Sequence, residues 1–202
     1  MANSKATNST GDLALIENCY IQTPGKLSGI YDTYTREFVG SWDGKIPMKI
    51  IPDISDGKSA SYGDEAAIGR SIPIKTFSHG ENRAISWTAH FIVCKQDDIA
   101  WNILYLRAIE SLVYPKTNVS GVPYSPPPVC LLKCGHLLGG SFSGDDSSVC
   151  AVLKNYDVKF SPDVPWDPIT LLPYKFSVGM SWDVVYKSND LPGQDRIMYK
   201  GR

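Results

Sequence analysis

The chain has 202 residues, of which 43% are hydrophobic and 20% charged, and its formal net charge is −1. This length and composition suit one globular domain with a buried core. The near-neutral charge and the absence of Lys/Arg runs argue against a nucleic acid as the main partner. No apolar run approaches the ~20 residues of a membrane span, and the N-terminus lacks the apolar core of a secretion signal.

Residues 1–45 are rich in Ser, Thr, Asn, Gly and Tyr and show no sustained periodicity. We therefore expect an extended, partly disordered N-terminal arm. The aromatic residues within this segment predict that parts of the arm dock on another surface. They are Tyr20, Tyr31, Tyr34, Phe38 and Trp42.

Three features are expected between the arm and the central strand. Residues 46–54 are apolar but contain Pro47 and Pro52, which predicts an irregular or edge strand. Residues 56–64 are polar and rich in turn formers, so we expect a loop. Residues 68–77 predict a short strand.

The central stretch is a strand that runs directly into a helix. From Arg83 to Cys94 apolar and polar residues alternate with period two, which is typical of a strand with one face on a core. Gln96, Asp97 and Asp98 supply a cap for a helix over residues 98–114, which Pro115 ends. Most positions of this helix are apolar, too many for an ordinary surface stripe. We expect its own sheet to cover one side and a neighbouring subunit the other.

Three more strands are predicted after the helix. A Pro- and Gly-rich loop over 115–128 leads into a short buried strand at 129–134. Residues 149–160 form a strand whose alternation changes phase near Asn155, which indicates a bulge. Residues 174–187 alternate most clearly and predict a long final strand. The fold class is thus mainly β with one helix (α+β), a β-barrel or sandwich over residues 46–188, with a polar C-terminal tail at 189–202.

Few residues suit catalysis. The three histidines are His79, His90 and His136, and the paired carboxylates fall at caps or in turns. Cys130, Cys134 and His136 form at most a metal half-site, against the simpler interpretation of a buried thiol pair beside an exposed histidine. We expect no enzyme, no cofactor and no metal.

The five cysteines contain no Cys-x-x-Cys pair and suit reduced thiols. Cys94, Cys130 and Cys150 lie in apolar strand contexts, where thiols act as small core residues. Cys130 and Cys134 cannot bridge each other within one strand, because four residues span ~13 Å.

Tryptophans offer a different kind of site. Trp87 and Trp182 fall on core-facing stripes, so we expect structural roles for both. Trp42 and Trp166 lie in predicted turns and could stack on a sugar.

A series of motifs resembles one family. The first stretch runs from Ile51-Pro52-Asp53-Ile54-Ser55 through Gly69-Arg70-Ser71-Ile72-Pro73-Ile74 to Gly80-Glu81-Asn82-Arg83-Ala84-Ile85-Ser86-Trp87. The second is Pro127-Pro128-Val129-Cys130-Leu131-Leu132-Lys133-Cys134-Gly135, followed by the strand 152–160 with Ser161-Pro162-Asp163. Together they resemble the tube-like proteins of contractile-tailed phages and contractile injection systems over residues 46–187.

This resemblance implies a tail-tube-like β-barrel located where the tail tube, the baseplate hub and the wedges or sheath meet. It also implies a ring of six copies. The chain departs from the family in two ways. We expect no LysM module after the final strand, and Val164-Pro165-Trp166-Asp167-Pro168 replaces the usual turn.

We therefore expect a structural virion protein, made in the host cytoplasm, that contacts itself and the tube, hub, wedge or sheath proteins. Alternatives are the tail tube subunit itself, or a peptidoglycan- or carbohydrate-binding module with Trp42 and Trp166 as stacking platforms. Seven residues are the expected subunit contacts: Trp101, Tyr105 and Leu112 on the helix, and Tyr31, Tyr34, Phe38 and Trp42 in the arm.

Overall fold

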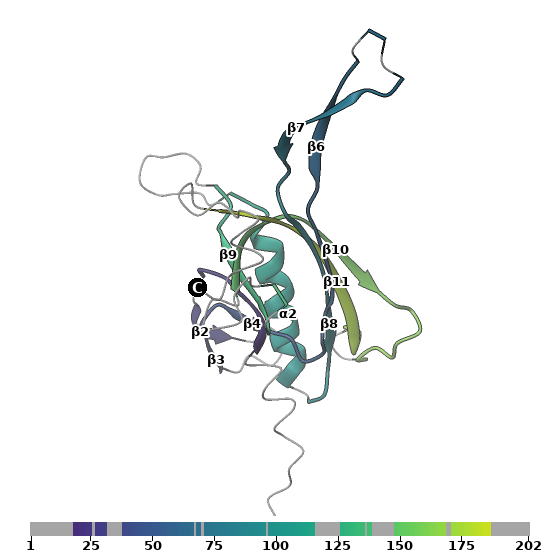
Figure 1. The fold of residues 1–202 in the computed structure, drawn as a ribbon. Helices are drawn as coiled ribbons and strands as arrows, with labels where there is room; N and C mark the ends of the chain where they lie inside the picture. Colours follow the sequence, from purple (N-terminus) through teal and green to yellow (C-terminus); the bar gives the residue numbers. More distant parts are fainter. Residues whose placement is uncertain are drawn as a thin grey trace, which may run out of the picture.

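The computed structural model describes residues 18–25, 27–31, 38–66, 68–69, 71–95, 97–115, 126–135, 137–138, 148–168 and 171–186. Within these residues the protein is mainly β, with one helix lying across a curved antiparallel sheet (Figure 1). The sheet has seven strands in the order β4-β1-β9-β10-β11-β8-β5, and two further strand pairs, β2-β3 and β6-β7, lie outside it. The elements are β1 (Cys19–Gln22), β2 (Leu27–Tyr31), β3 (Phe38–Trp42), β4 (Lys45–Pro47), β5 (Asp53–Gly57), β6 (Ala60–Glu65), β7 (Ile74–Gly80), β8 (Ala84–Ile92), α2 (Asp97–Ser111), β9 (Cys130–Cys134), β10 (Ser148–Phe160) and β11 (Lys175–Val184).

The core lies between the sheet and α2. Alternate residues of β8 and β11 point toward it, and Trp87 and Trp182 are fully buried there, which confirms the expected core-facing stripes. Helix α2 contributes Ala108 and Ile109, the latter also fully buried. Because one face of each strand is apolar and the other polar, the sheet can bury only one of its faces.

The start of α2 is fixed by side-chain hydrogen bonds. Asp98 Oδ2 accepts hydrogen bonds from the backbone N–H groups of Cys94 and Lys95, both at 2.9 Å, and its Oδ1 pairs with Lys49 Nζ at 2.6 Å. Burial opposes ionisation of Asp98, but these hydrogen bonds outweigh it and hold the pKa of the carboxyl below its ordinary value. The buried Asn102 amide donates to Ile92 O at 3.1 Å, so the helix is also tied to the end of β8.

Several strands agree with their predicted places. β8, β9 and β11 fall within the predicted segments, and the pairing of β10 with β11 shifts register between Leu153 and Asn155, where the bulge was expected. The helix begins and ends within three residues of the predicted bounds.

The N-terminal part of the sheet differs from the prediction. β1 lies inside the sheet between β4 and β9, so the sheet begins within the segment expected to be an extended arm. Its four residues are too few to show periodicity, and its place is set by pairing with β9, more than a hundred residues away. The single strand expected at 46–54 is two strands, β4 and β5, on opposite edges of the sheet. Gly44 lies between β3 and β4 with φ of 89°, and a Cβ there would come within 2.3 Å of Gly25 O.

The expected closed barrel is not found among the described strands. β4 and β5 end the seven-stranded sheet on its two sides, and no pairing joins them within the described ranges. The sequence predicted six strands, and the described part of the chain has eleven. The difference arises because short strands and most of the β6-β7 pair show no clear periodicity.

Candidate functional site

A long β-hairpin projects from one end of the sheet (Figure 1). β5 pairs with β8 from Asp53↔Thr88 to Gly57↔Ala84, and β6 pairs with β7 from Ala60↔Gly80 to Glu65↔Ile74. The chain thus continues from the edge strand β5 into a separate two-stranded hairpin, β6-β7, and then returns to the sheet as β8. We call residues 58–82 the projecting hairpin. β6 lies where a loop was expected at 56–64, and the strand expected at 68–77 is found in part, as β7 from Ile74.

The projecting hairpin exposes large apolar side chains, which we call the hairpin patch. Their exposed fractions are Tyr62 58%, Ile68 108%, Ile72 74%, Ile74 40% and Phe77 65%. The rings of Tyr62 and Phe77 meet edge to face across the two strands, with centroids 5.7 Å apart. None of these residues belongs to the core of the described structure.

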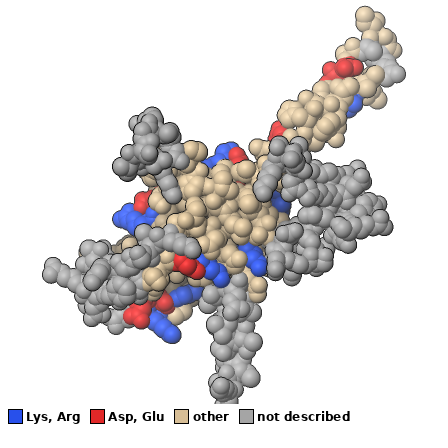
Figure 2. All heavy atoms as spheres, turned by 90° about the vertical axis from the view of Figure 1, so that its left-hand side faces the viewer, with Lys and Arg blue, Asp and Glu red and all other residues tan. Residues whose placement is uncertain are grey.

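A two-stranded hairpin is marginally stable in water, and exposed apolar clusters mark interaction surfaces. In Figure 2 the projecting hairpin is mostly uncharged, apart from a small group of charged atoms near its outer half. Asp64 and Lys75 are register partners on the two strands, and their side chains pair at 2.5 Å. The hairpin patch is therefore the leading candidate for a contact with another polypeptide.

The base of the hairpin is held by Arg83. Its Nε and Nη2 donate to the two carboxylate oxygens of Asp56 on β5, the Nε contact measuring 2.7 Å. Nη2 also donates to Leu138 O at 2.9 Å, which links the base to the segment after β9. The Asp56 carboxylate raises the pKa of Arg83 above its ordinary value, although burial opposes this shift. The base of the projecting hairpin is thus tied to β5 and to the segment after β9.

A smaller apolar cluster lies at the other end of the sheet, in the turn between β10 and β11. Phe160, Trp166 and Leu171 are exposed by 48%, 44% and 71%. Because Asp183 pairs with Ala84 next to the hairpin and Phe160 pairs with Phe176, the two apolar clusters lie at opposite ends of the long strands. Ring contacts of 5.1–6.3 Å connect Trp166 to α2 through Phe160, Phe176, Phe91, Tyr105 and Trp101.

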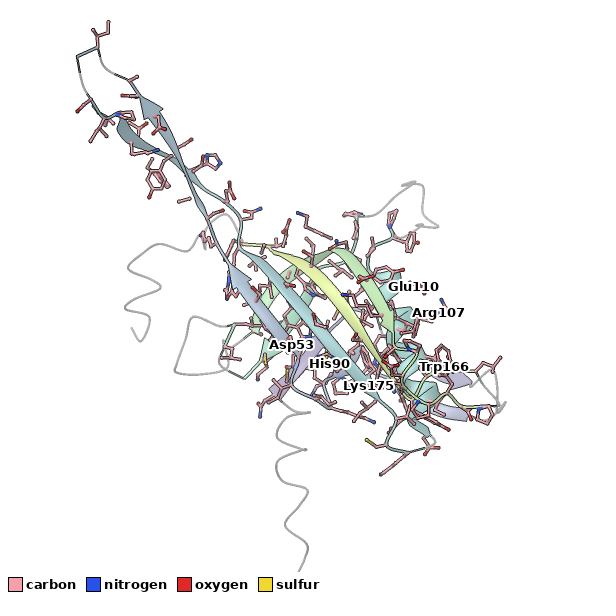
Figure 3. The ribbon with its side chains drawn as sticks, turned by 90° about the vertical axis from the view of Figure 1, so that its right-hand side faces the viewer. Asp53, His90, Arg107, Glu110, Trp166 and Lys175 are labelled. Carbon is pink, nitrogen blue, oxygen red and sulfur yellow. The ribbon has the colours of Figure 1, made fainter. Side chains whose placement is uncertain are left out.

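The helix-free face of the sheet is polar. Figure 3 shows Asp53, His90 and Lys175 side by side on β5, β8 and the start of β11. His90 Nε2 lies 3.1 Å from Asp53 Oδ2, so the two side chains form a hydrogen bond on the surface. Most outward-facing positions of β8 and β11 carry polar residues or Gly, with Ser the commonest.

The predicted contact residues on the helix fall into two groups. Trp101 and Tyr105 are half-buried, with ring centroids 5.9 Å apart, and both pack against the chain's own core. Burial raises the pKa of Tyr105 to about 12. Leu112 is only 4% exposed and lies within the core. The described structure therefore accounts for Leu112 without any partner.

Of the arm residues, Trp42 is also a core residue, 7% exposed, and its Nε1 donates to Lys45 O at 2.7 Å. The expectation that Trp42 lies exposed in a turn is wrong, because its side chain packs in the core. Tyr31 and Phe38 pair with each other in β2 and β3, and Tyr34 lies outside the described residues.

The hairpin patch was missed because neither of its strands has a buried face to impose alternation. A weak signal was present: Ile68, Ile72 and Ile74 lie in a segment otherwise rich in turn residues, as Tyr62 does. Apolar residues in a turn-rich segment are candidates for an exposed contact.

The described residues hold no cluster of three or more His, Cys, Asp or Glu side chains that could bind a metal ion. They also contain no helix with the length and apolarity that crossing a membrane requires. No protein-family model matches the chain, and no curated protein matches it.

Proposed function

We propose that this chain is a structural subunit of a contractile phage tail or a related injection machine, arranged as a ring at the baseplate. In this proposal the ring joins the tail tube or hub to the wedges or sheath. The observation that carries the proposal is the hairpin patch, a set of large apolar side chains outside the core on a hairpin whose base is tied to β5 by Arg83. A patch of this kind suits permanent docking on a neighbouring subunit.

The placement of the sheet edges and apolar clusters supports a ring. A closed ring of identical subunits needs two different surfaces on each copy, because its contacts are head-to-tail. β4 and β5 form the two edges of the sheet, and the hairpin patch and the Trp166 cluster lie at opposite ends of its strands. The resemblance to tube-like tail proteins supports the number six and the tail-tube-like barrel, with closure against neighbouring copies.

A sugar-binding module is the second candidate. Trp166 is 44% exposed beside Phe160, with ring centroids 6.3 Å apart, and an exposed aromatic pair can stack on a sugar ring. The buried Trp42 removes the second expected platform. Binding of the full chain to cell-wall sacculi, lost in Trp166→Ala and retained in Tyr114→Ala, would favour this candidate over the tail subunit.

Copy number tests the proposal. Quantitative mass spectrometry of purified tail particles from the source organism should give six or twelve copies per particle. A hundred or more copies would make the chain the tail tube subunit. Absence from every such particle would refute the tail assignment and leave the sugar-binding module as the better candidate.

A further inference from the structure

Two cysteines that are far apart in the sequence meet in the core. Cys19 on β1 and Cys134 on β9 are register partners, and their Sγ atoms lie 3.2 Å apart. Both are buried, with exposed fractions of 1% and 6%. Cys94 and Cys150 are exposed, contrary to the expectation that they lie in the core, and Cys130 is buried at the other end of β9, four residues from Cys134.

The backbone pattern places the two thiols face to face. Cys19 O accepts a hydrogen bond from Met48 N, so the backbone of Cys19 points toward β4 and away from β9. The neighbouring pair is joined by Gly135 N donating to Asn18 O at 2.8 Å. Cys19 and Cys134 are therefore a non-hydrogen-bonded pair, in which Cα atoms of antiparallel strands are about 4.5 Å apart and side chains are closest. That spacing lies within the range that a disulfide spans.

The same contact activates one sulfur. Cys19 Sγ donates to Cys134 Sγ, which lowers the pKa of the Cys134 thiol below its ordinary value although burial opposes this. The pKa of Cys19 is raised by the same hydrogen bond and by burial. Because a thiolate is the form that reacts with oxidants, Cys134 is the sulfur that reacts first.

We infer that Cys19 and Cys134 form an oxidisable pair, which hydrogen peroxide converts into an intrachain disulfide linking β1 to β9. The Cys134 thiolate attacks the O–O bond of the peroxide, giving a sulfenic acid and hydroxide. The Cys19 thiol then attacks that sulfur, forming the S–S bond and releasing water after proton transfer. Overall two thiols lose two electrons and two protons, and one peroxide becomes two waters.

The disulfide has a structural consequence for the N-terminal strand. β1 has four residues and is held by pairing with β4 and β9. A bond across 115 residues ties it to the strand that follows the helix and closes most of the core into one loop. The N-terminal strand is then locked into the sheet after oxidation, for instance once a particle has left the reducing cytosol. This inference stands whether or not the chain is a tail subunit.

Peptide mapping of the oxidised full chain tests the inference. The purified chain is treated with hydrogen peroxide, free thiols are blocked with N-ethylmaleimide, and the protein is digested without reduction. We expect a peptide joining Cys19 to Cys134, an intact mass before alkylation that is lower by two hydrogen atoms, and a Tm higher by on the order of 10 °C. A reducing agent should reverse all three changes.

Matched variants identify the pair. Cys94→Ser/Cys150→Ser removes the two exposed thiols and should leave the linked peptide and the Tm rise unchanged. Cys134→Ser should lose both, and because oxidised and reduced samples of each protein are compared, any lower starting stability does not affect the result. Recovery of Cys19 and Cys134 as separately alkylated peptides, their linkage to other cysteines, or sulfinic acid at Cys134 without a link would overturn the inference.

Discussion

Replacing Ile72 with serine should weaken assembly while leaving the fold intact. Ile72 is 74% exposed and lies outside the core, so its removal costs the isolated chain little stability. If a neighbouring subunit covers it, about three-quarters of its burial energy is gained only on assembly. Full burial of an aliphatic side chain stabilises by about 1.5–3 kcal/mol, so we expect a loss of about 1–2 kcal/mol and an affinity about 5- to 30-fold lower.

The assay is a competition within one cell. The Ile72→Ser chain and the unchanged chain are co-expressed during particle production, and the peptide that spans residue 72 distinguishes them by mass. Its ratio in purified particles, compared with the soluble pool, should fall by the same 5- to 30-fold. Leu137→Ser is the matched control, because Leu137 is 73% exposed and lies outside the projecting hairpin. Equal incorporation of Ile72→Ser and the unchanged chain, or equal exclusion of both variants, would refute the reasoning.

Three further predictions concern stability. Arg83→Met removes the contacts to Asp56 and Leu138 O and should lower the free energy of unfolding by about 1–3 kcal/mol. Amide exchange in residues 58–82 should become faster. Unchanged exchange would contradict the role of Arg83 in holding the base of the hairpin. The pKa of Asp98 is lowered in the folded state, so its stabilisation is present above about pH 4 and is lost as the pH falls. Urea unfolding at pH 7 and pH 3 should therefore differ less in Asp98→Asn than in the unchanged chain, and an equal difference removes this account. Trp182→Ala should cost about 3–5 kcal/mol in chemical denaturation, because the side chain is fully buried, and a cost below about 1 kcal/mol would contradict the core assignment.

The sequence predicted the elements whose residues have one buried face. β8 and β11 alternate because one side of each packs on the core, and that packing is visible as a period of two. The α2 helix is predicted by its acidic start and by the proline that follows it. These three segments supply many of the core residues.

The remaining elements depend on partners that are distant in the sequence. β1 is a strand because β9 and β4 flank it, and four residues carry no periodicity of their own. β6 and β7 bury neither face, so their apolar residues follow no pattern that identifies a strand. Pro47 and Pro52 suggested one irregular strand, whereas the chain between them crosses from one sheet edge to the other.

The sequence did not separate contact residues from core residues at two of the expected positions, for a related reason. Residue type alone indicated that Trp42 and Leu112 were available for contacts, yet both fill the core. Five exposed apolar residues, the hairpin patch, lie instead on the projecting hairpin, outside the core of the described structure. Whether an aromatic residue packs in the core or is exposed depends on how its strand pairs with the others.

Site-specific photo-crosslinking in assembled particles tests the central claim most directly. A photoreactive amino acid replaces Ile72 in one sample and Leu137 in the other, and particles are irradiated before denaturing electrophoresis. The account predicts a covalent adduct between residue 72 and another polypeptide, identified by mass spectrometry as a second copy or a neighbouring tail protein, and a much weaker adduct from residue 137. Particles that contain the chain but give no adduct from residue 72 would contradict the claim that the hairpin patch is an assembly contact.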